Sequence, residues 1–306
     1  AAGGGPANKG RPATERGGRE ARALRQLQAW RVPKAAGAPT ALACEQAAEG
    51  VVHVFVGTQA GVLLRAGPGP EDLREICKSH APQAVARLLL GQPAHSDLGA
   101  WYTAGGSAPA LFSADVEGRV LRTTFSRAEA GGSCEPVASE ACAELGSPVL
   151  ALELSAQLGR LLVSTTERIA VIDGAFEPAF GRSPGDQQDY MRYVGSKPHK
   201  GQLTATFSRT FGPEALISAR PGGRLWVAEG STGTVQSTLK FQRPGKDDKA
   251  TLGRLVSLDR GKVISWARAG DGSDGGDGAP PLVLLDLEAI AVCREWSLSP
   301  IVDADR

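Results

Sequence analysis

Short apolar runs separated by turns rich in Gly and charged residues recur along the chain from about residue 38 onward. Runs of Val, Ile and Leu on both sides of such a turn are typical of β-hairpins. Five strand-turn-strand units stand out, at His53–Gly67, Ala110–Ser126, Leu161–Gly174, Leu216–Gly230 and Leu255–Arg268. The pattern therefore predicts an all-β fold.

The hairpins recur at a long period. Their turns centre near Ala60, Gly118, Glu167, Gly222 and Gly261, roughly 40 to 60 residues apart, which is the spacing of one propeller blade per unit. A β-sandwich would place turns about every 8 to 12 residues, and a Rossmann-type fold would need long amphipathic helices between its strands. We predict a WD40-like β-propeller of six to seven blades over residues 38–306.

Three segments interrupt the hairpin pattern. Glu71–Leu90 has helical composition broken by Pro82, and we expect an insertion between blades or a helix that caps one face. The segments Phe180–Lys200 and Gly270–Pro281 are expected to be loop insertions.

The N-terminal residues 1–37 form a basic, low-complexity arm that we expect to be disordered, with a short helix over Glu15–Gln28. Such an arm either contacts acidic lipid or RNA or is a solvated tail. The formal net charge of +1 gives no global field that attracts nucleic acid. No apolar run has the length of a transmembrane segment, and the N-terminus has no apolar signal region, so we expect a cytoplasmic protein.

Known catalytic and metal-binding signatures do not occur. There is no phosphate-binding loop, no nucleophile elbow, and no Cys or His spacing typical of zinc, so we expect no enzyme activity, no catalytic residues, no cofactor and no metal. The acidic segment Gly270–Gly278 lacks the ligand spacing of an EF-hand and is expected to be a flexible loop. The odd number and wide scatter of the cysteines favour buried, reduced thiols at Cys44, Cys77, Cys134, Cys142 and Cys293.

Two groups of side chains raise the question of a recognition surface. Among the tryptophans Trp101, Trp226, Trp266 and Trp296, we expect Trp226 and Trp266 to pack between neighbouring blades. The loop from Arg182 to Arg209 is basic and either docks an acidic partner or lipid headgroup or is solvated; its relevant side chains are Tyr190, Arg192, Tyr193, Lys197, His199, Lys200 and Arg209. The sequence does not show which side chains would bind a partner protein.

Between Ala215 and Phe241, an Ala-Arg-Pro-Gly turn at Ala219–Gly222 precedes an Arg-x-Trp strand at Arg224–Trp226 and a Gly-x-Val-x-x-Thr strand at Gly233–Thr238. With these motifs, the segment resembles the N-terminal β-propeller shared by the Hermansky-Pudlak syndrome 5 protein and tectonin β-propeller repeat-containing protein 2. The upstream segment Gly159–Asp173 and the downstream sequence GKVISWARAG are also similar. The likeness extends over about Val149–Trp266, and the segment before Gly201 and the acidic loop after Arg268 depart from it.

The resemblance implies a non-enzymatic, cytoplasmic protein-interaction scaffold in vesicle trafficking and lysosome-related organelle biogenesis. The tectonin-repeat branch of the family implies an autophagy or secretory-pathway adaptor instead. Its implied partners are other protein subunits of a trafficking complex, with peripheral association to endosomal or lysosomal membranes through them and no nucleic acid. Two other possibilities stay open, an RNA- or chromatin-associated adaptor that binds through the basic arm and an enzyme with its site in the central channel.

Overall fold

A computed structural model describes residues 30–46, 52–66, 73–91, 110–125, 136–176, 190–198, 204–242, 252–266 and 281–297. Within these ranges the chain forms five four-stranded antiparallel sheets, and no helix there is long and apolar enough to cross a membrane. The prediction of an all-β chain is confirmed.

Each sheet is a meander of four consecutive strands. The first sheet contains β1 (Pro39–Gln46), β2 (Val52–Thr58), β3 (Leu63–Ala66) and β4 (Leu73–Cys77). The second contains β5 (Val85–Gly91), β6 (Ala110–Asp115), β7 (Arg119–Phe125) and β8 (Pro136–Glu144). The third contains β9 (Val149–Ser155), β10 (Arg160–Thr165), β11 (Ile169–Ile172) and β12 (Met191–Tyr193). The fourth contains β13 (Ala205–Phe207), β14 (Ala215–Arg220), β15 (Arg224–Glu229) and β16 (Val235–Lys240). The fifth contains β17 (Arg254–Ser257), β18 (Lys262–Trp266), β19 (Pro281–Asp286) and β20 (Ala291–Ser297).

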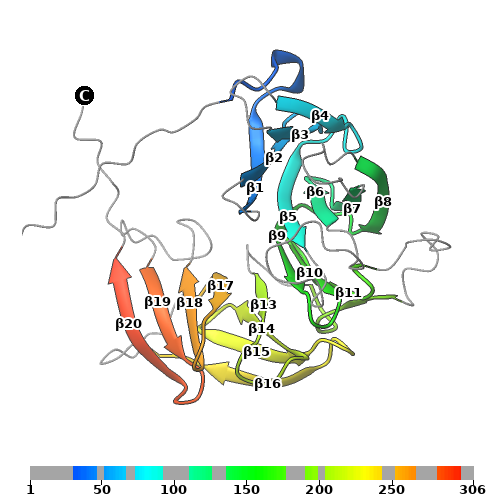
Figure 1. Cartoon of the computed structure of the whole chain (residues 1–306). Helices are drawn as coiled ribbons and strands as arrows, with labels where there is room; N and C mark the ends of the chain where they lie inside the picture. Colours follow the sequence, from blue (N-terminus) through cyan, green and yellow to red (C-terminus); the bar gives the residue numbers. More distant parts are fainter. Residues whose placement is uncertain are drawn as a thin grey trace, which may run out of the picture.

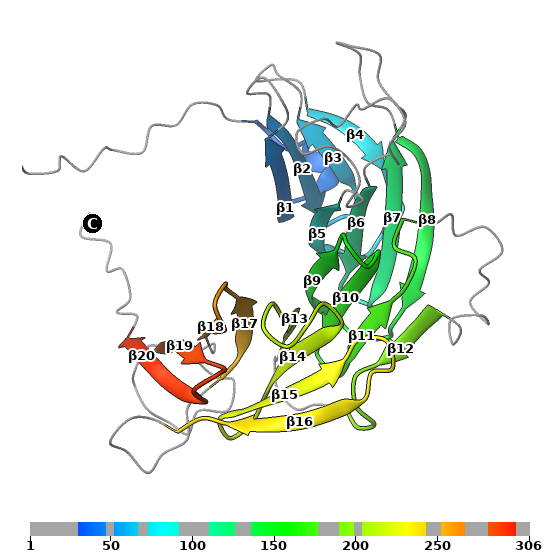
Figure 2. The same ribbon diagram turned by 60° about the horizontal axis from the view of Figure 1, so that its bottom comes forward.

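The sheets follow one another along an arc, with the first strand of each sheet on the inner side and the last strand on the outer side (Figures 1 and 2). Side chains of the inner strands tie consecutive sheets together. The Thr40 hydroxyl donates to the carbonyl of Val85 at 2.6 Å, and Glu153 accepts from the amide of Phe207 at 3.1 Å. The arc is therefore held at its inner side by hydrogen bonds that pass from one sheet to the next.

Apolar side chains fill each junction between neighbouring sheets. The four junctions have separate clusters, and each draws residues from both of its sheets. The clusters include Phe55, Leu63, Val85 and Leu111 between the first and second sheets, and Phe112, Val120, Leu161 and Ile172 between the second and third. They include Leu162, Val171, Leu216 and Ala228 between the third and fourth sheets, and Ile217, Leu225, Val263 and Leu285 between the fourth and fifth. Because both faces of the three middle sheets and one face of each terminal sheet contribute to such a layer, burial between sheets is a main source of stability for the array.

The turn after the second strand repeats in the first three sheets. In each case a buried polar side chain at the end of the second strand accepts hydrogen bonds from backbone amides of the turn. Thr58 accepts from Val62, Asp115 from Glu117 and Arg119, and Thr165 from Glu167 and Arg168. These turns are also held by equivalent backbone bonds to the residue just before the sheet: Gln59 to Ala38, Val116 to Ala84, and Thr166 to Pro148. The internal repeat is therefore present in the geometry.

All five hairpins expected from the sequence are present. Four of them are the second and third strands of their sheets, whereas Leu255–Arg268 contains the first and second strands, β17 and β18. The expected closed propeller with six to seven blades is not observed, since the described residues form five sheets and no strand pairing joins the first to the last. These two sheets stand apart at the ends of the arc (Figures 1 and 2).

The helical interpretation of Glu71–Leu90 is wrong. This segment contains strands β4 and β5, and Pro82 lies in the turn between them. Val85, at the start of β5, is completely buried in the cluster between the first two sheets, with Leu88 and Leu90 packed against it. Packing of these side chains outweighs the helical propensity of the segment.

The N-terminal boundary differs from the expected one. Residues 1–29 lie outside the described residues, as does the expected helix Glu15–Gln28. Lys34–Ala36 forms a short 3-10 helix, and Ala36 packs on Val56 and Leu64 of the first sheet. Part of the segment 30–37, which the sequence places in the disordered arm, therefore packs on the outer face of the first sheet through Val32 and Ala36.

The expectation of buried cysteines is wrong for two of them. Cys44 and Cys293 are exposed, while Cys77 and Cys142 are half-buried, and none of these four cysteines is in a disulfide. Both exposed cysteines lie on terminal sheets, where no further described sheet covers them. Cys134 and the acidic loop Gly270–Gly278 lie outside the described residues.

Candidate interaction surface

Three side chains at the junction of the first two sheets have the hydrogen-bond pattern of a serine hydrolase triad. His80, in the turn between β4 and β5, lies with Nδ1 2.9 Å from Asp115 Oδ2 and with Nε2 2.8 Å from Ser113 Oγ. The residues Ser113 and Asp115 come from the end of β6. The pattern of roles matches that of acyl-transfer enzymes, so access to substrate decides whether it is a catalytic group.

Burial identifies this group as structural. The side chain of His80 is 0% exposed and that of Asp115 is 2% exposed, and Ser113 is likewise completely buried. A nucleophile needs an open site next to it for the reacting atom of the substrate. The next junction has a simpler counterpart, in which Ser147 donates to Thr165 at 2.8 Å. The hydrogen bonds among His80, Ser113 and Asp115 therefore stabilise the junction between the first and second sheets.

The stability of this junction is expected to depend on pH. Burial lowers the pKa of His80, and the hydrogen bond and charge of Asp115 offset only part of that effect. The unfolded chain therefore takes up a proton first, near the ordinary histidine pKa of about 6.5. The contribution of His80 to stability is fully present above this pH and is lost as the pH falls through the lower pKa of the folded protein.

We expect the free energy of unfolding to decrease more steeply between about pH 7 and pH 5 in the wild-type protein than in a His80→Asn variant. Urea unfolding at several pH values measures both slopes, and the difference between the two proteins isolates His80 from other titrating groups. Equal slopes would mean that His80 titrates alike in the folded and unfolded chains.

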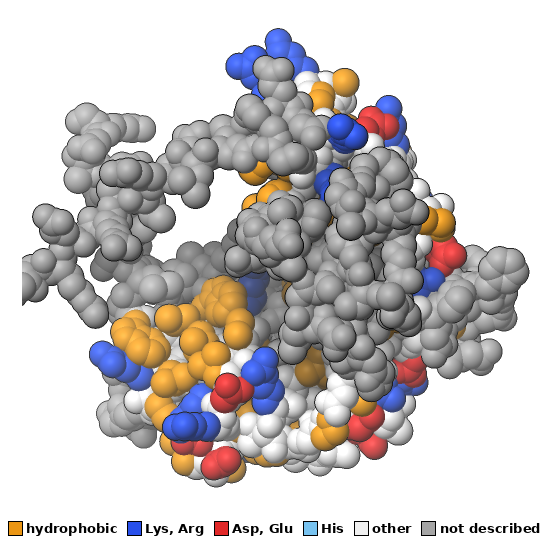
Figure 3. Space-filling model, viewed as in Figure 1, with side chains coloured by type: hydrophobic (Ala, Val, Ile, Leu, Met, Phe, Trp, Pro, Cys, Tyr) orange, Lys and Arg blue, Asp and Glu red, His pale blue; other side chains and the backbone are white. Residues whose placement is uncertain are grey.

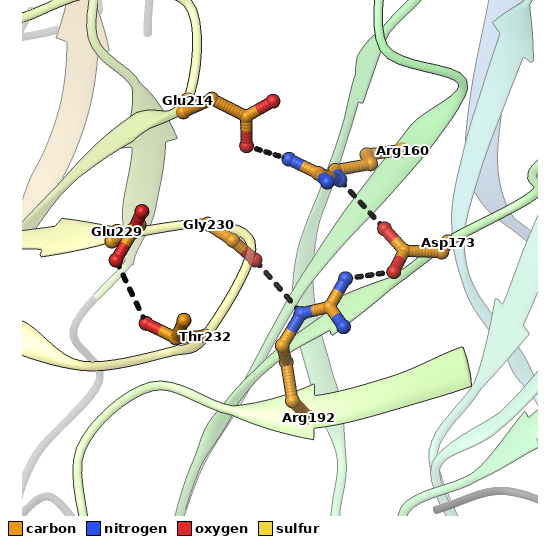
Figure 4. A network of polar contacts seen from close by, with 7 residues as sticks. All are labelled: Arg160, Asp173, Arg192, Glu214, Glu229, Gly230 and Thr232. Carbon is orange, nitrogen blue, oxygen red and sulfur yellow. Dashed lines mark hydrogen bonds and ion pairs between the residues drawn. The ribbon is translucent and has the colours of Figure 1, made fainter. Parts of the chain in front are cut away.

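A network of ion pairs joins the third and fourth sheets (Figure 4). Arg160 at the start of β10 pairs with Asp173, at 2.6 Å, and with Glu214 of the next sheet. Arg192 of β12 pairs with Asp173 and donates to the carbonyl of Gly230 at 2.9 Å. Burial, followed by the charge of Arg160, lowers the pKa of Arg192, whose guanidinium stays charged. These half-buried groups satisfy each other across the junction.

Arg192, one of the cations expected in a docking loop, belongs to this ion-pair network. Arg192 is engaged with Asp173, and Arg209 pairs with Asp259 at 2.7 Å. Tyr190 is buried, and Tyr193 lies beneath Arg168 with 4.9 Å between the guanidinium carbon and the ring centre. Lys197 is exposed, whereas His199 and Lys200 lie outside the described residues. The structure does not bring these side chains together into one surface.

The tryptophans occupy different environments. Trp226 of β15 is half-buried, and a Cβ on Gly195 of the neighbouring sheet would lie 2.8 Å from its ring, so Trp226 packs at a junction as expected. Trp266 lies in register with Leu282 and Trp296 on the outer face of the fifth sheet, where no described sheet packs. The interpretation of Trp266 as a residue between blades does not match this position. Trp101 lies outside the described residues.

The outer face of the fifth sheet carries a group of apolar side chains between charged ones such as Arg254, Lys262 and Asp286. Val256, which is 43% exposed, lies opposite Ile264, and Ile264 lies opposite Leu284. Figure 3 shows apolar side chains gathered over β17–β20. The opposite face of this sheet packs on the fourth sheet through Leu255, Val263 and Leu285.

A row of three cations crosses the fourth sheet. Arg220 of β14 lies directly opposite Arg224 of β15, which lies directly opposite Lys240 of β16. Opposite residues of antiparallel strands point to the same face of the sheet. The row therefore places three positive charges side by side on the face that also carries Trp226. The sequence contained one signal for it, the two arginines that flank the turn Pro221–Gly223, and the register of Lys240 could not be inferred from that signal.

The described residues offer no group suited to a metal ion. No cluster of three or more His, Cys, Asp or Glu side chains occurs there with positions that could hold one. The cation row remains as a group of charges that has no ion-pair partner among the described residues.

Comparison with known proteins supports the fold and does not identify a family. No protein-family model matches the chain. No curated protein matches it either. Among solved structures, Raptor from Chaetomium thermophilum matches with a TM-score of 0.53 and 12% sequence identity over 86% of this chain. The match spans 21% of the Raptor chain, and at this identity it indicates a shared fold alone.

A second solved structure, the computationally designed Ika8 protein, matches with a TM-score of 0.47 and 16% identity. The alignment covers 85% of this chain and 61% of Ika8. Together with the five meander sheets, the match to Raptor is consistent with an all-β array of blade-like sheets.

Proposed function

We propose that the chain is a non-enzymatic protein-interaction scaffold built on a WD40-like β-propeller of six to seven blades. The observation that carries this proposal is the cation row Arg220–Arg224–Lys240 on a rigid sheet. None of the described Asp or Glu side chains forms an ion pair with these three cations. Opposed like charges weaken a sheet, so a row of them favours a role outside folding.

The intracellular role that we propose comes from the family resemblance. It is vesicle trafficking in lysosome-related organelle biogenesis, with a cytoplasmic chain that reaches endosomal or lysosomal membranes through its protein partners. Autophagy and secretory traffic are the alternative branch. The residues that carry the resemblance, Ala219–Gly222 and Arg224–Trp226, contain two cations of the row and the tryptophan beside it, which supports placing the interaction there.

The test is a pull-down from cytosolic extract with the full chain as bait, followed by mass spectrometry of the bound proteins at low and moderate salt. An Arg224→Gln/Lys240→Gln variant removes two exposed charges from the row. The control, Lys34→Gln/Lys78→Gln, removes two exposed charges near the first sheet, one from the 3-10 helix and one just after β4, where Lys78 pairs with Glu75.

We expect organelle-biogenesis or autophagy proteins to bind the wild-type chain and the control, to survive moderate salt, and to decrease several-fold with the row variant. Recovery of RNA-associated proteins that wash off with salt would instead indicate nonspecific phosphate binding. Equal recovery with all three baits would place the interaction elsewhere on the chain.

A further inference from the structure

The cations of the row are held in place by the sheet and by one aromatic ring. The guanidinium carbon of Arg220 lies 3.8 Å from the centre of the Trp226 ring. A guanidinium stacked in this way keeps its N–H groups at its edge, where they can donate to a carboxylate. Arg224 is oriented by a hydrogen bond from its Nε to the carbonyl of Pro221, at 3.1 Å. The two arginines are therefore preorganised on either side of one turn.

The electrostatics of the row favour an anion. Strands of a sheet lie about 4.8 Å apart, so the backbone positions of the row span about 10 Å. Burial, followed by the charge of Arg224, lowers the pKa of Arg220. Both effects act against the charged form of Arg220, and a bound carboxylate would offset both. Lys240 and Arg224 are exposed and accessible to such a group.

The row ends at an open strand edge. β16 is the last strand of its sheet, and no described strand pairs with its outer side. Three consecutive residues of β16 are exposed, Gln236–Thr238, as is Lys240. An edge strand presents backbone N–H and C=O groups that a polypeptide can pair with. A phosphate group or a lipid headgroup cannot make these repeated backbone bonds.

We propose that an extended acidic segment of a partner protein adds to β16 as a fifth strand and extends the cation row with a carboxylate. This inference rests on the proposed scaffold function and names the chemistry of its partner. A carboxylate directly opposite Lys240 lies about 5 Å away at the Cβ level and within reach of the long Arg224 side chain. Two residues along the added strand, a polar side chain lies opposite the exposed Thr238. Backbone pairing supplies affinity, and the charges supply selectivity.

The test uses a fluorescent decapeptide of alternating Thr and Glu, titrated with the full chain at low salt by fluorescence anisotropy. We expect saturable binding that weakens about tenfold in the Arg224→Gln/Lys240→Gln variant, which corresponds to about 1.4 kcal/mol. The Lys34→Gln/Lys78→Gln control is expected to bind as the wild-type chain does. Circular dichroism and thermal melting of the three proteins verify that they are equally folded.

Two N-methylated forms of the peptide test strand addition separately from charge. One form carries a methyl group on every Glu amide and the other on every Thr amide, so both keep all their carboxylates. Alternate residues of a strand point their backbone groups to opposite edges. We expect one methylated form to lose binding and the other to keep it. Equal binding by both forms would overturn strand addition and leave only charge attraction.

Two further outcomes would also overturn the inference. One is binding of vesicles that contain phosphatidylserine, sensitive to the row variant, with no binding of the peptide. The other is a peptide that does not bind although the row variant loses its partners in the pull-down. In the second case the scaffold function stands and the acidic strand is wrong. Conversely, peptide binding without any pulled-down partner would contradict the trafficking role and leave the surface chemistry intact.

Discussion

Replacing Asp115 with Ala is expected to lower the free energy of unfolding by about 3 to 5 kcal/mol, because three hydrogen bonds lose their acceptor. The carboxylate is 2% exposed and serves two elements at once. One oxygen accepts from the amides of Glu117 at 3.0 Å and Arg119 at 2.9 Å, and the other lies 2.9 Å from His80. Truncation leaves the buried His80 ring and the two partly buried turn amides without this acceptor, because no other side chain of the turn replaces the carboxylate.

Asp286→Ala provides the matched comparison for that measurement. Asp286 also accepts from two turn amides, those of Glu288 at 3.0 Å and Ala289 at 2.9 Å, and its second partner is the accessible Lys262. Water can replace the lost bonds there, so urea unfolding should show a clearly smaller loss. If the two variants were equally destabilised, capping of the turn alone would explain the effect and the buried bond to His80 would contribute little.

The sequence predicted the repeat because hairpin turns have a strong local signature. Gly118 and Gly222 adopt positive φ of 92° and 77° in the turns where they were expected, and the apolar runs beside them become the buried strands β6 and β14. In the fifth sheet the acidic segment Gly270–Gly278 lies in sequence between β18 and β19, and the strongest local turn signal is Leu258–Gly261, between β17 and β18. The hairpin was found, and its place in the sheet was shifted by one strand.

Tertiary contacts decided the features that the sequence did not predict. Glu71–Leu90 forms strands because Val85 and Leu90 face a cluster that includes Phe55, Leu111 and Phe125 from other strands. The triad of His80, Ser113 and Asp115 joins residues more than thirty positions apart, so no short motif could show it.

The candidate surface was predicted only in part, for the same reason. Local charge density marks the loop from Arg182 to Arg209 as basic, but Arg192 and Arg209 form ion pairs with carboxylates from other segments, Asp173 and Asp259. Lys240 carries no distinctive local signal, and only strand register places it beside Arg224. The charge pattern of a β-sheet surface thus depends on register, which a single sequence specifies weakly when the paired residues are exposed.

Gly233→Ala is expected to destabilise the protein by about 2 to 5 kcal/mol, for two separable reasons. Gly233 has a φ of 72°, and a Cβ there would collide with the carbonyl oxygen of Tyr193 in the neighbouring sheet. The backbone cannot move aside freely, because the Gly233 carbonyl accepts from the amide of Gly195 at 2.9 Å across the same junction.

Gly159→Ala isolates the cost of the positive φ from the cost of the collision. Gly159 has a φ of 60° with nothing within 4 Å of its added Cβ, and we expect a cost of about 1 to 2 kcal/mol. Thermal and urea unfolding of both variants would measure the difference, which is the contribution of close contact between the third and fourth sheets. An equal loss of stability in the two variants would mean that the third and fourth sheets can move apart to accommodate the added Cβ. The third sheet would then not fix the position of the fourth sheet and its cation row.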